Sequence, residues 1–122
     1  MATEATTRAC LHCALARALR AESAALARRG LEVRLSVVDP ILLPMRGARV
    51  YRALRRLLRE AELAAQPPGP LKVAIIMLRG KSHAEVTATF PVGRRAVIRS
   101  CAFPLFVPGA LAGGFAEALD LG

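Results

Sequence analysis

The feature that most constrains the fold is the alternation of helical and strand-like periodicity along the chain. Helical segments carry apolar side chains every three or four residues, whereas strand segments alternate apolar and polar residues or are continuously apolar. The expected elements are a helix at 8–29, a strand at 31–38, a helix at 48–65, strands at 71–79, 84–90 and 95–101, and a helix at 115–120. A short strand over 105–107 is a further candidate.

This order of elements predicts an α/β (α+β) fold, a two-layer sandwich of helices on a mixed, mostly antiparallel sheet. Residues 71–79 are expected to be buried on both faces, and residues 84–90 and 95–101 to follow as hairpin strands. A chain of 122 residues is within the range of one domain, so residues 1–122 are interpreted as a single domain. The proline-rich stretch 66–70 is then a turn between elements.

Composition bounds the class of protein. The chain is 54% hydrophobic but only 4% aromatic, so its core must consist of Leu, Val, Ile and Ala. The first eight residues are polar, unlike an export signal, and the longest apolar run, Val73 to Leu78, is too short to span a membrane. We therefore expect a cytoplasmic protein without a membrane partner, in which three cysteines indicate redox, metal or buried-thiol roles.

The second notable feature is a net charge of +9, from 18 basic and 9 acidic residues. Arginine dominates, and one arc of the helix at 48–65 is almost entirely arginine, which favours binding to the backbone of RNA or DNA. The candidate nucleic-acid-binding residues are Arg49, Arg52, Arg55, Arg56 and Arg59, together with Arg79, Lys81, Arg94 and Arg95 from two turns. The same residues are also consistent with a solvated helix face or with an acidic protein partner. The apolar composition and the scarcity of aromatic residues also allow a homodimer or a larger complex.

The third feature is a pair of cysteines, Cys10 and Cys13, spaced C-x-x-C at the start of the first helix, with His12 between them. Unpaired backbone N–H groups and the helix dipole stabilise a thiolate at a helix N-terminus. A second thiol three residues later is within reach to resolve a mixed disulfide. This arrangement predicts thiol–disulfide chemistry.

Here the sequence resembles the thioredoxin superfamily, because Cys-x-His-Cys is similar to the active-site motif of disulfide isomerases and oxidases. The stretch from Phe103 to Val107, followed by Gly113-Gly114 before the last helix, resembles the end of glutaredoxins. The resemblance implies a thioredoxin-like fold in which Pro104 is a cis-proline facing the dithiol. It also implies that Cys10 is the nucleophile and Cys13 the resolving thiol.

The leading hypothesis is therefore a thiol–disulfide oxidoreductase or redox sensor that acts on protein or small-molecule thiols without a bound cofactor. Its candidate catalytic residues are Cys10, His12, Cys13 and Pro104. The alternative is a basic nucleic-acid-binding or complex-forming subunit without catalysis, in which the cysteines are structural. Zinc binding by Cys10, Cys13, Cys101 and His83 is a third reading, although a second C-x-x-C is missing.

Overall fold

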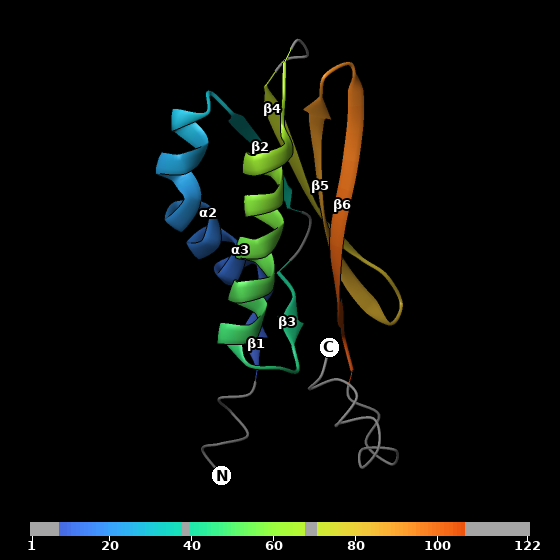
Figure 1. Cartoon of the computed structure of the whole chain (residues 1–122). Coiled ribbons are helices and arrows are strands. Elements are labelled where there is room, and N and C mark those ends of the chain that lie inside the picture. Colours follow the sequence, from blue (N-terminus) through green and yellow to red (C-terminus); the bar gives the residue numbers. More distant parts are fainter. Residues whose placement is uncertain (1–7, 38–39, 68–70, 107–122) are drawn as a thin grey trace.

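The computed structural model describes residues 8–37, 40–67 and 71–106. These residues form two long helices and six strands (Figure 1). In chain order the elements are β1 (Ala9–Cys10), α2 (Leu11–Arg28), β2 (Glu32–Val37), β3 (Leu42–Leu43), α3 (Gly47–Ala64), β4 (Lys72–Arg79), β5 (His83–Val92) and β6 (Arg95–Pro104).

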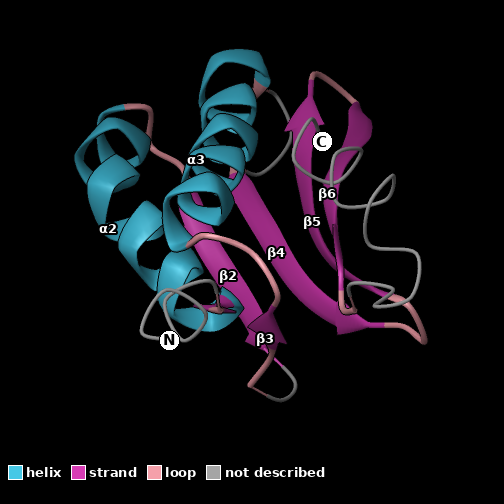
Figure 2. Ribbon diagram, turned by 90° about the horizontal axis from the view of Figure 1, so that it is seen from below, coloured by secondary structure: helices cyan, strands magenta, loops and turns pink. Residues whose placement is uncertain are grey.

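The main sheet has the strand order β2-β4-β5-β6. Strand β2 is parallel to β4, whereas β4–β5 and β5–β6 are antiparallel hairpin pairs. Helices α2 and α3 lie side by side on one face of this sheet, as both Figure 1 and Figure 2 show. The predicted two-layer sandwich with a mixed, mostly antiparallel sheet is confirmed.

Strands β1 and β3 are two residues each and pair antiparallel with each other, outside the main sheet. Sequence periodicity did not predict them, because a two-residue strand is too short to show alternation. Their pairing holds the start of α2 against the chain that leads into α3, and it therefore determines where Cys10 lies.

The core fills the space between the helices and the covered face of the sheet. On β5, Ala84, Val86, Ala88 and Phe90 are all buried, which is the two-residue period expected of a half-buried strand. The largest fully buried side chains are Phe90, Leu11, Leu15, Ile41, Leu43, Leu54, Leu58, Ile75, Met77, Val50, Val73 and Val86. A core built almost without aromatic residues agrees with the composition.

The prediction that the strand at 71–79 is buried on both faces is wrong. Strand β4 buries Val73, Ile75 and Met77 under the helices, but Ile76 and Leu78 on the opposite face are 36% and 47% exposed. No described element covers that face (Figure 2). A continuous apolar run identifies the strand but not how many layers enclose it.

The residues next to each end of α2 explain where this helix begins and ends. Helix α2 ends at Arg28, and Gly30 then adopts a φ of 70°, which a residue without a Cβ reaches at no steric cost. Its N-cap is Cys10, whose sulfur accepts the Cys13 N–H. Of the remaining predictions, the helix at 115–120 and the pair Gly113-Gly114 lie outside the described residues, and Leu105 and Phe106 are not in a strand.

Candidate functional site

The first candidate site is the N-terminus of α2, where the backbone fixes Cys10. Cys10 pairs with Leu42 across the β1–β3 ladder, and the Leu11 N–H donates to the Ile41 carbonyl at 2.9 Å. The Cys10 sulfur caps the helix, because it accepts the Cys13 N–H at 3.2 Å. One cysteine is therefore anchored by strand pairing and the other is carried by the first helical turn.

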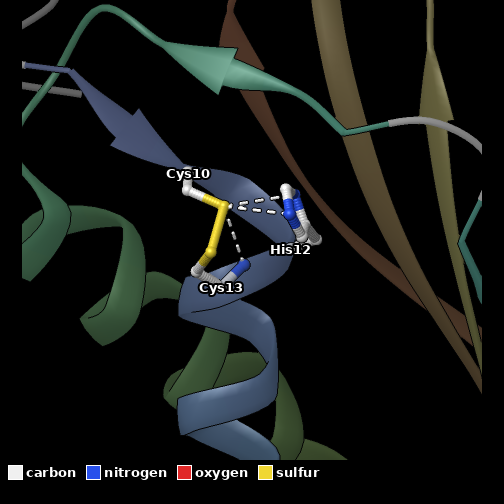
Figure 3. Close-up of side chains that lie close together, drawn as sticks. All are labelled: Cys10, His12 and Cys13. Carbon is white, nitrogen blue, oxygen red and sulfur yellow. Dashed lines mark hydrogen bonds between the residues drawn. A yellow bond between two sulfur atoms is a disulfide. The ribbon is translucent and has the colours of Figure 1, made fainter.

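The side chains of Cys10, His12 and Cys13 meet at this end of the helix (Figure 3). Cys10 and Cys13 are joined by a disulfide, and the Cys10 sulfur lies 3.2 Å from both ring nitrogens of His12. Cys10 and His12 are half-buried, whereas Cys13 is exposed. The structure thus brings together three of the four predicted catalytic residues.

The fourth, Pro104, belongs to a different sheet. It is the last residue of β6, where it pairs with His83 at the start of β5. Its predicted role facing the dithiol therefore stays a prediction.

The zinc ligand set Cys10, Cys13, Cys101 and His83 is not assembled. Cys101 is half-buried in β6 opposite Val86, and burial, with Glu85 and Glu60 nearby, raises the pKa of its thiol to about 12. Among the described residues, the cluster with metal-ligand character is Cys10, His12 and Cys13. This cluster contains His12, which the zinc hypothesis did not include, and it lacks Cys101 and His83.

The predicted basic surface is divided by the fold. Arg79 and Lys81 lie at the β4–β5 turn, whereas Arg94 and Arg95 lie at the β5–β6 turn. These turns are at opposite ends of the ten-residue strand β5 (Figure 1), a separation of roughly 30 Å. The two turns therefore do not lie next to each other, and their joint contact with a nucleic acid stays a prediction.

The arginines of α3 also differ among themselves. Arg52, Arg56 and Arg59 are exposed, but Arg49 and Arg55 are half-buried. Arg55 donates through Nε to the Glu22 carboxylate at 2.7 Å, so this cation is used within the fold. Arg55 is therefore less available to an external anion than the exposed arginines of α3, because the Glu22 carboxylate neutralises it.

That internal acid belongs to a second cluster, which the sequence interpretation missed. Glu22 on α2 and Glu62 on α3 are buried at 3% and 9% exposure, between the two helices. Both lie four residues beyond a buried apolar residue of their helix, Ala18 and Leu58 respectively. A carboxylate on the apolar stripe of each of two helices was the signal that could have revealed the cluster.

The two carboxyl groups share a proton. If both were ionised, Glu62 Oε2 would be a buried oxygen with no donor. Burial and the neighbouring Glu22 raise the pKa of Glu62 to about 7. The hydrogen bond from Glu62, with the cations Arg55 and Arg59, lowers the pKa of Glu22. Protonated Glu62 therefore donates to ionised Glu22, whose charge Arg55 balances.

The aromatic ring of Tyr51 extends this cluster. The Arg55 guanidinium centre lies 5.7 Å from the ring centroid and that of Arg17 lies 5.2 Å away. Both distances are within the range of a cation–π interaction. The hydrogen bond to Glu22 is the main reason that the pKa of Arg55 is raised. The cluster is an internal charge network that joins α2 to α3.

The chain shares its fold with parts of two histidine kinases. The mycobacterial sensor histidine kinase MprB matches with a TM-score of 0.55 and 21% identity, over 67% of this chain and 52% of that one. The Acinetobacter baumannii histidine kinase AdeS matches with a TM-score of 0.56 and 14% identity, over 68% and 40%. No family model and no curated protein matches the chain.

These neighbours correct the functional hypotheses. The leading prediction, a thioredoxin-like oxidoreductase or redox sensor, is wrong, because the fold matches histidine kinases. The thiol partners that it required lose their basis, and the nucleic-acid alternative gains no support from these structures. The C-x-x-C motif does not identify the fold, because it specifies two cysteines and says nothing about the sheet behind them.

The described helices are not of a kind that crosses a bilayer, because none combines sufficient length with sufficient apolar character. The present chain spans about half, or less, of the length of the matched kinases. An acidic protein partner, a homodimer and a larger complex all stay predictions.

Proposed function

We propose that this chain is a sensor-kinase-related domain that binds a nucleoside triphosphate in the cytoplasm, where such nucleotides are available. The observation that carries the proposal is the fold shared with MprB and AdeS over about two thirds of the chain. A histidine kinase by its name transfers a phosphoryl group, and phosphoryl transfer depends on holding the triphosphate with cations.

The charge of this chain supports an anionic ligand. The net charge is +9, and Arg52 and Arg56 are exposed on α3. Guanidinium groups bind phosphate oxygens bidentately, so an exposed arginine pair one helical turn apart suits a triphosphate. Arg55 is excluded from this role, because its guanidinium is bound to Glu22.

The acidic residues bear on how this chain would hold the magnesium ion that accompanies a nucleoside triphosphate. Mg²⁺ in kinases is usually held by carboxylates as well as by phosphates. The glutamates that the structure describes already have polar neighbours: Glu22 and Glu62 are buried together, Glu32 pairs with Arg34, Glu60 with Arg99, and Glu85 accepts from Thr87. We therefore expect the triphosphate and water to supply the magnesium ligands.

The test is the thermal stability of the purified chain with magnesium and ATP. A ligand that binds only the folded state stabilises it by about 2.7 kcal/mol at a hundred times its dissociation constant, so the melting temperature should rise with ATP concentration. A strongly basic protein also attracts any polyanion, so magnesium tripolyphosphate at the same concentration, in about 0.2 M salt, is the control.

Stabilisation by ATP that exceeds stabilisation by tripolyphosphate would support the proposal. The variant Arg52→Gln/Arg56→Gln should then weaken the effect of ATP, whereas the variant Arg94→Gln/Arg95→Gln, with the same charge change at the β5–β6 turn, should not. Equal stabilisation by both polyanions, or none by ATP, would overturn it.

A further inference from the structure

The cluster at the start of α2 has the composition of a metal site. The ligand atoms of Cys10, His12 and Cys13 all lie within 4.8 Å of one another (Figure 3). In a tetrahedral zinc site, Zn–S bonds of about 2.3 Å and Zn–N bonds of about 2.0–2.1 Å place the ligand atoms about 3.5–3.8 Å apart. Once the disulfide is reduced, the three ligand atoms therefore start close to the separations that one zinc ion requires.

The backbone is already arranged for this chemistry. The Cys13 N–H donates to the Cys10 sulfur at 3.2 Å, and such a bond stabilises a thiolate, the form that binds metals. The positive end of the helix dipole favours both thiolates. Strand pairing of Cys10 with Leu42 fixes one ligand before any ion binds, which reduces the ordering that binding requires.

We propose that the reduced chain binds one Zn²⁺ through the sulfur atoms of Cys10 and Cys13 and a ring nitrogen of His12, with the fourth position open to water. Three protein ligands with one open position form a known class of zinc site. The exposure of Cys13 leaves that position accessible to solvent. This site is independent of the proposed nucleotide binding.

The bound state is reached from the disulfide in two balanced steps. First, two equivalents of an added thiol reduce the Cys10–Cys13 bond, which gives two protein thiols and one disulfide of the reductant. Second, Zn²⁺ displaces the two thiol protons, forms two Zn–S bonds and one Zn–N bond, and releases two protons to solvent. Zinc keeps its oxidation state throughout.

The test uses the full chain, reduced and freed of metal, and titrated with Co²⁺ without oxygen. Cobalt in place of zinc gives visible absorption typical of four-coordinate geometry and a near-ultraviolet band from sulfur-to-cobalt charge transfer. We expect one equivalent of Co²⁺ to give both signals and one equivalent of Zn²⁺ to remove them. Up to two protons should be released for each zinc ion bound, fewer where a thiol is already ionised, and the disulfide form should give no signal.

Matched variants identify the ligands. His12→Ala should weaken zinc binding by at least roughly tenfold, since even changes outside the ligand shell cause losses of that size. Cys10→Ser and Cys13→Ser should each reduce the charge-transfer band, and serine retains an oxygen that caps the helix at position 10. His83→Ala and Cys101→Ser, which change the other histidine and the other cysteine, should leave the affinity unchanged.

Circular dichroism of each variant, which should match that of the parent chain, separates loss of a ligand from loss of folding. The proposal is overturned if the reduced protein gives no cobalt signal. It is equally overturned if His12→Ala binds zinc as tightly as the parent chain, or if Cys101→Ser abolishes binding.

Discussion

At the scale of single residues, Glu62 shows how one buried proton couples the fold to pH. Its carboxyl group lies between α2 and α3, beside Glu22 and near the cations Arg55 and Arg59. The two acids depart from their ordinary pKa in opposite directions, because one proton is held between them and the cations favour the charge on Glu22. The two groups therefore act on stability in different pH ranges.

Stability should fall as the pH rises from 4.5 to about 7, the ordinary and the folded-state pKa of Glu62. In this range the unfolded chain has lost the Glu62 proton while the folded chain keeps it, so a rising pH favours unfolding. The difference in pKa corresponds to about 3 kcal/mol at most. Below pH 4.5 the sign reverses, because the lowered pKa of Glu22 makes the folded state bind fewer protons than the unfolded one.

The variant Glu62→Gln should remove most of the loss of folding stability above pH 4.5, because the glutamine amide cannot ionise and still donates a hydrogen bond to Glu22. At pH 8 the variant should be more stable than the parent chain, and at pH 4.5 nearly equal to it. Urea denaturation at both pH values measures the free energy of unfolding of the variant and of the parent chain. Glu60→Gln, an exposed neighbour on the same helix, is the control, and an unchanged pH dependence in Glu62→Gln would contradict the shared proton.

At the scale of the elements, α3 is held by its apolar stripe. Leu54 is fully buried on this helix, whereas Leu63, nine residues later, is 76% exposed. The same residue type on the same helix therefore separates the effect of burial from that of helix propensity, because both substitutions by alanine change propensity equally.

Leu54→Ala should lower the free energy of unfolding by about 2–5 kcal/mol, since it removes buried methyl groups and leaves a cavity. Leu63→Ala should change it by less than about 0.5 kcal/mol. Chemical denaturation of both variants measures the difference. Equal effects would mean that α3 is not packed on the sheet as described.

Two glycines next to helices, Gly30 after α2 and Gly47 at the start of α3, should respond differently to substitution by alanine. Gly30 has a φ of 70°, and a Cβ there would meet Leu71 at an ordinary 3.9 Å, so only the backbone conformation opposes a side chain. Gly30→Ala should cost about 1–2 kcal/mol, the penalty of left-handed backbone for an L-residue. Gly47→Ala, at the open start of α3, should be neutral or stabilising. Thermal unfolding compares the stability of the two variants. A Gly30→Ala variant as stable as the parent chain would contradict the left-handed turn.

At the scale of the whole molecule, the net charge of +9 opposes folding, because like charges are closer in the folded state than in the unfolded chain. The ion pairs between exposed groups, such as Arg34–Glu32 at 3.5 Å, offset little of this repulsion. The large buried apolar surface is therefore what stabilises the fold.

Salt should consequently stabilise this protein. Raising NaCl from about 20 to 200 mM shortens the screening length to below about 10 Å, so the melting temperature should rise by a few degrees. The variant Arg52→Gln/Arg56→Gln, with a net charge of +7 obtained as 9 − 2, should show a smaller rise. Scanning calorimetry over the salt series measures the melting temperature of both proteins. A melting temperature that falls with salt would show that attraction between opposite charges outweighs the repulsion.

The sequence alone determined the elements and their class. Hydrophobic periodicity placed α2, α3, β2, β4, β5 and β6 within a few residues of their observed bounds, because core-facing side chains must recur at the period of their element. It also placed Cys10 and Cys13 at a helix start. These properties are local, and the residues that decide them lie within a turn or a strand of one another.

Only the tertiary structure decided which distant groups meet. The Glu22–Glu62 pair depends on two helices lying side by side, and the division of the basic residues depends on β5 placing its two turns at opposite ends of the sheet. The parallel pairing of β2 with β4 and the uncovered face of β4 follow from topology as well. Periodicity specifies which face of an element is apolar, but contacts between elements far apart in the chain specify what that face packs against.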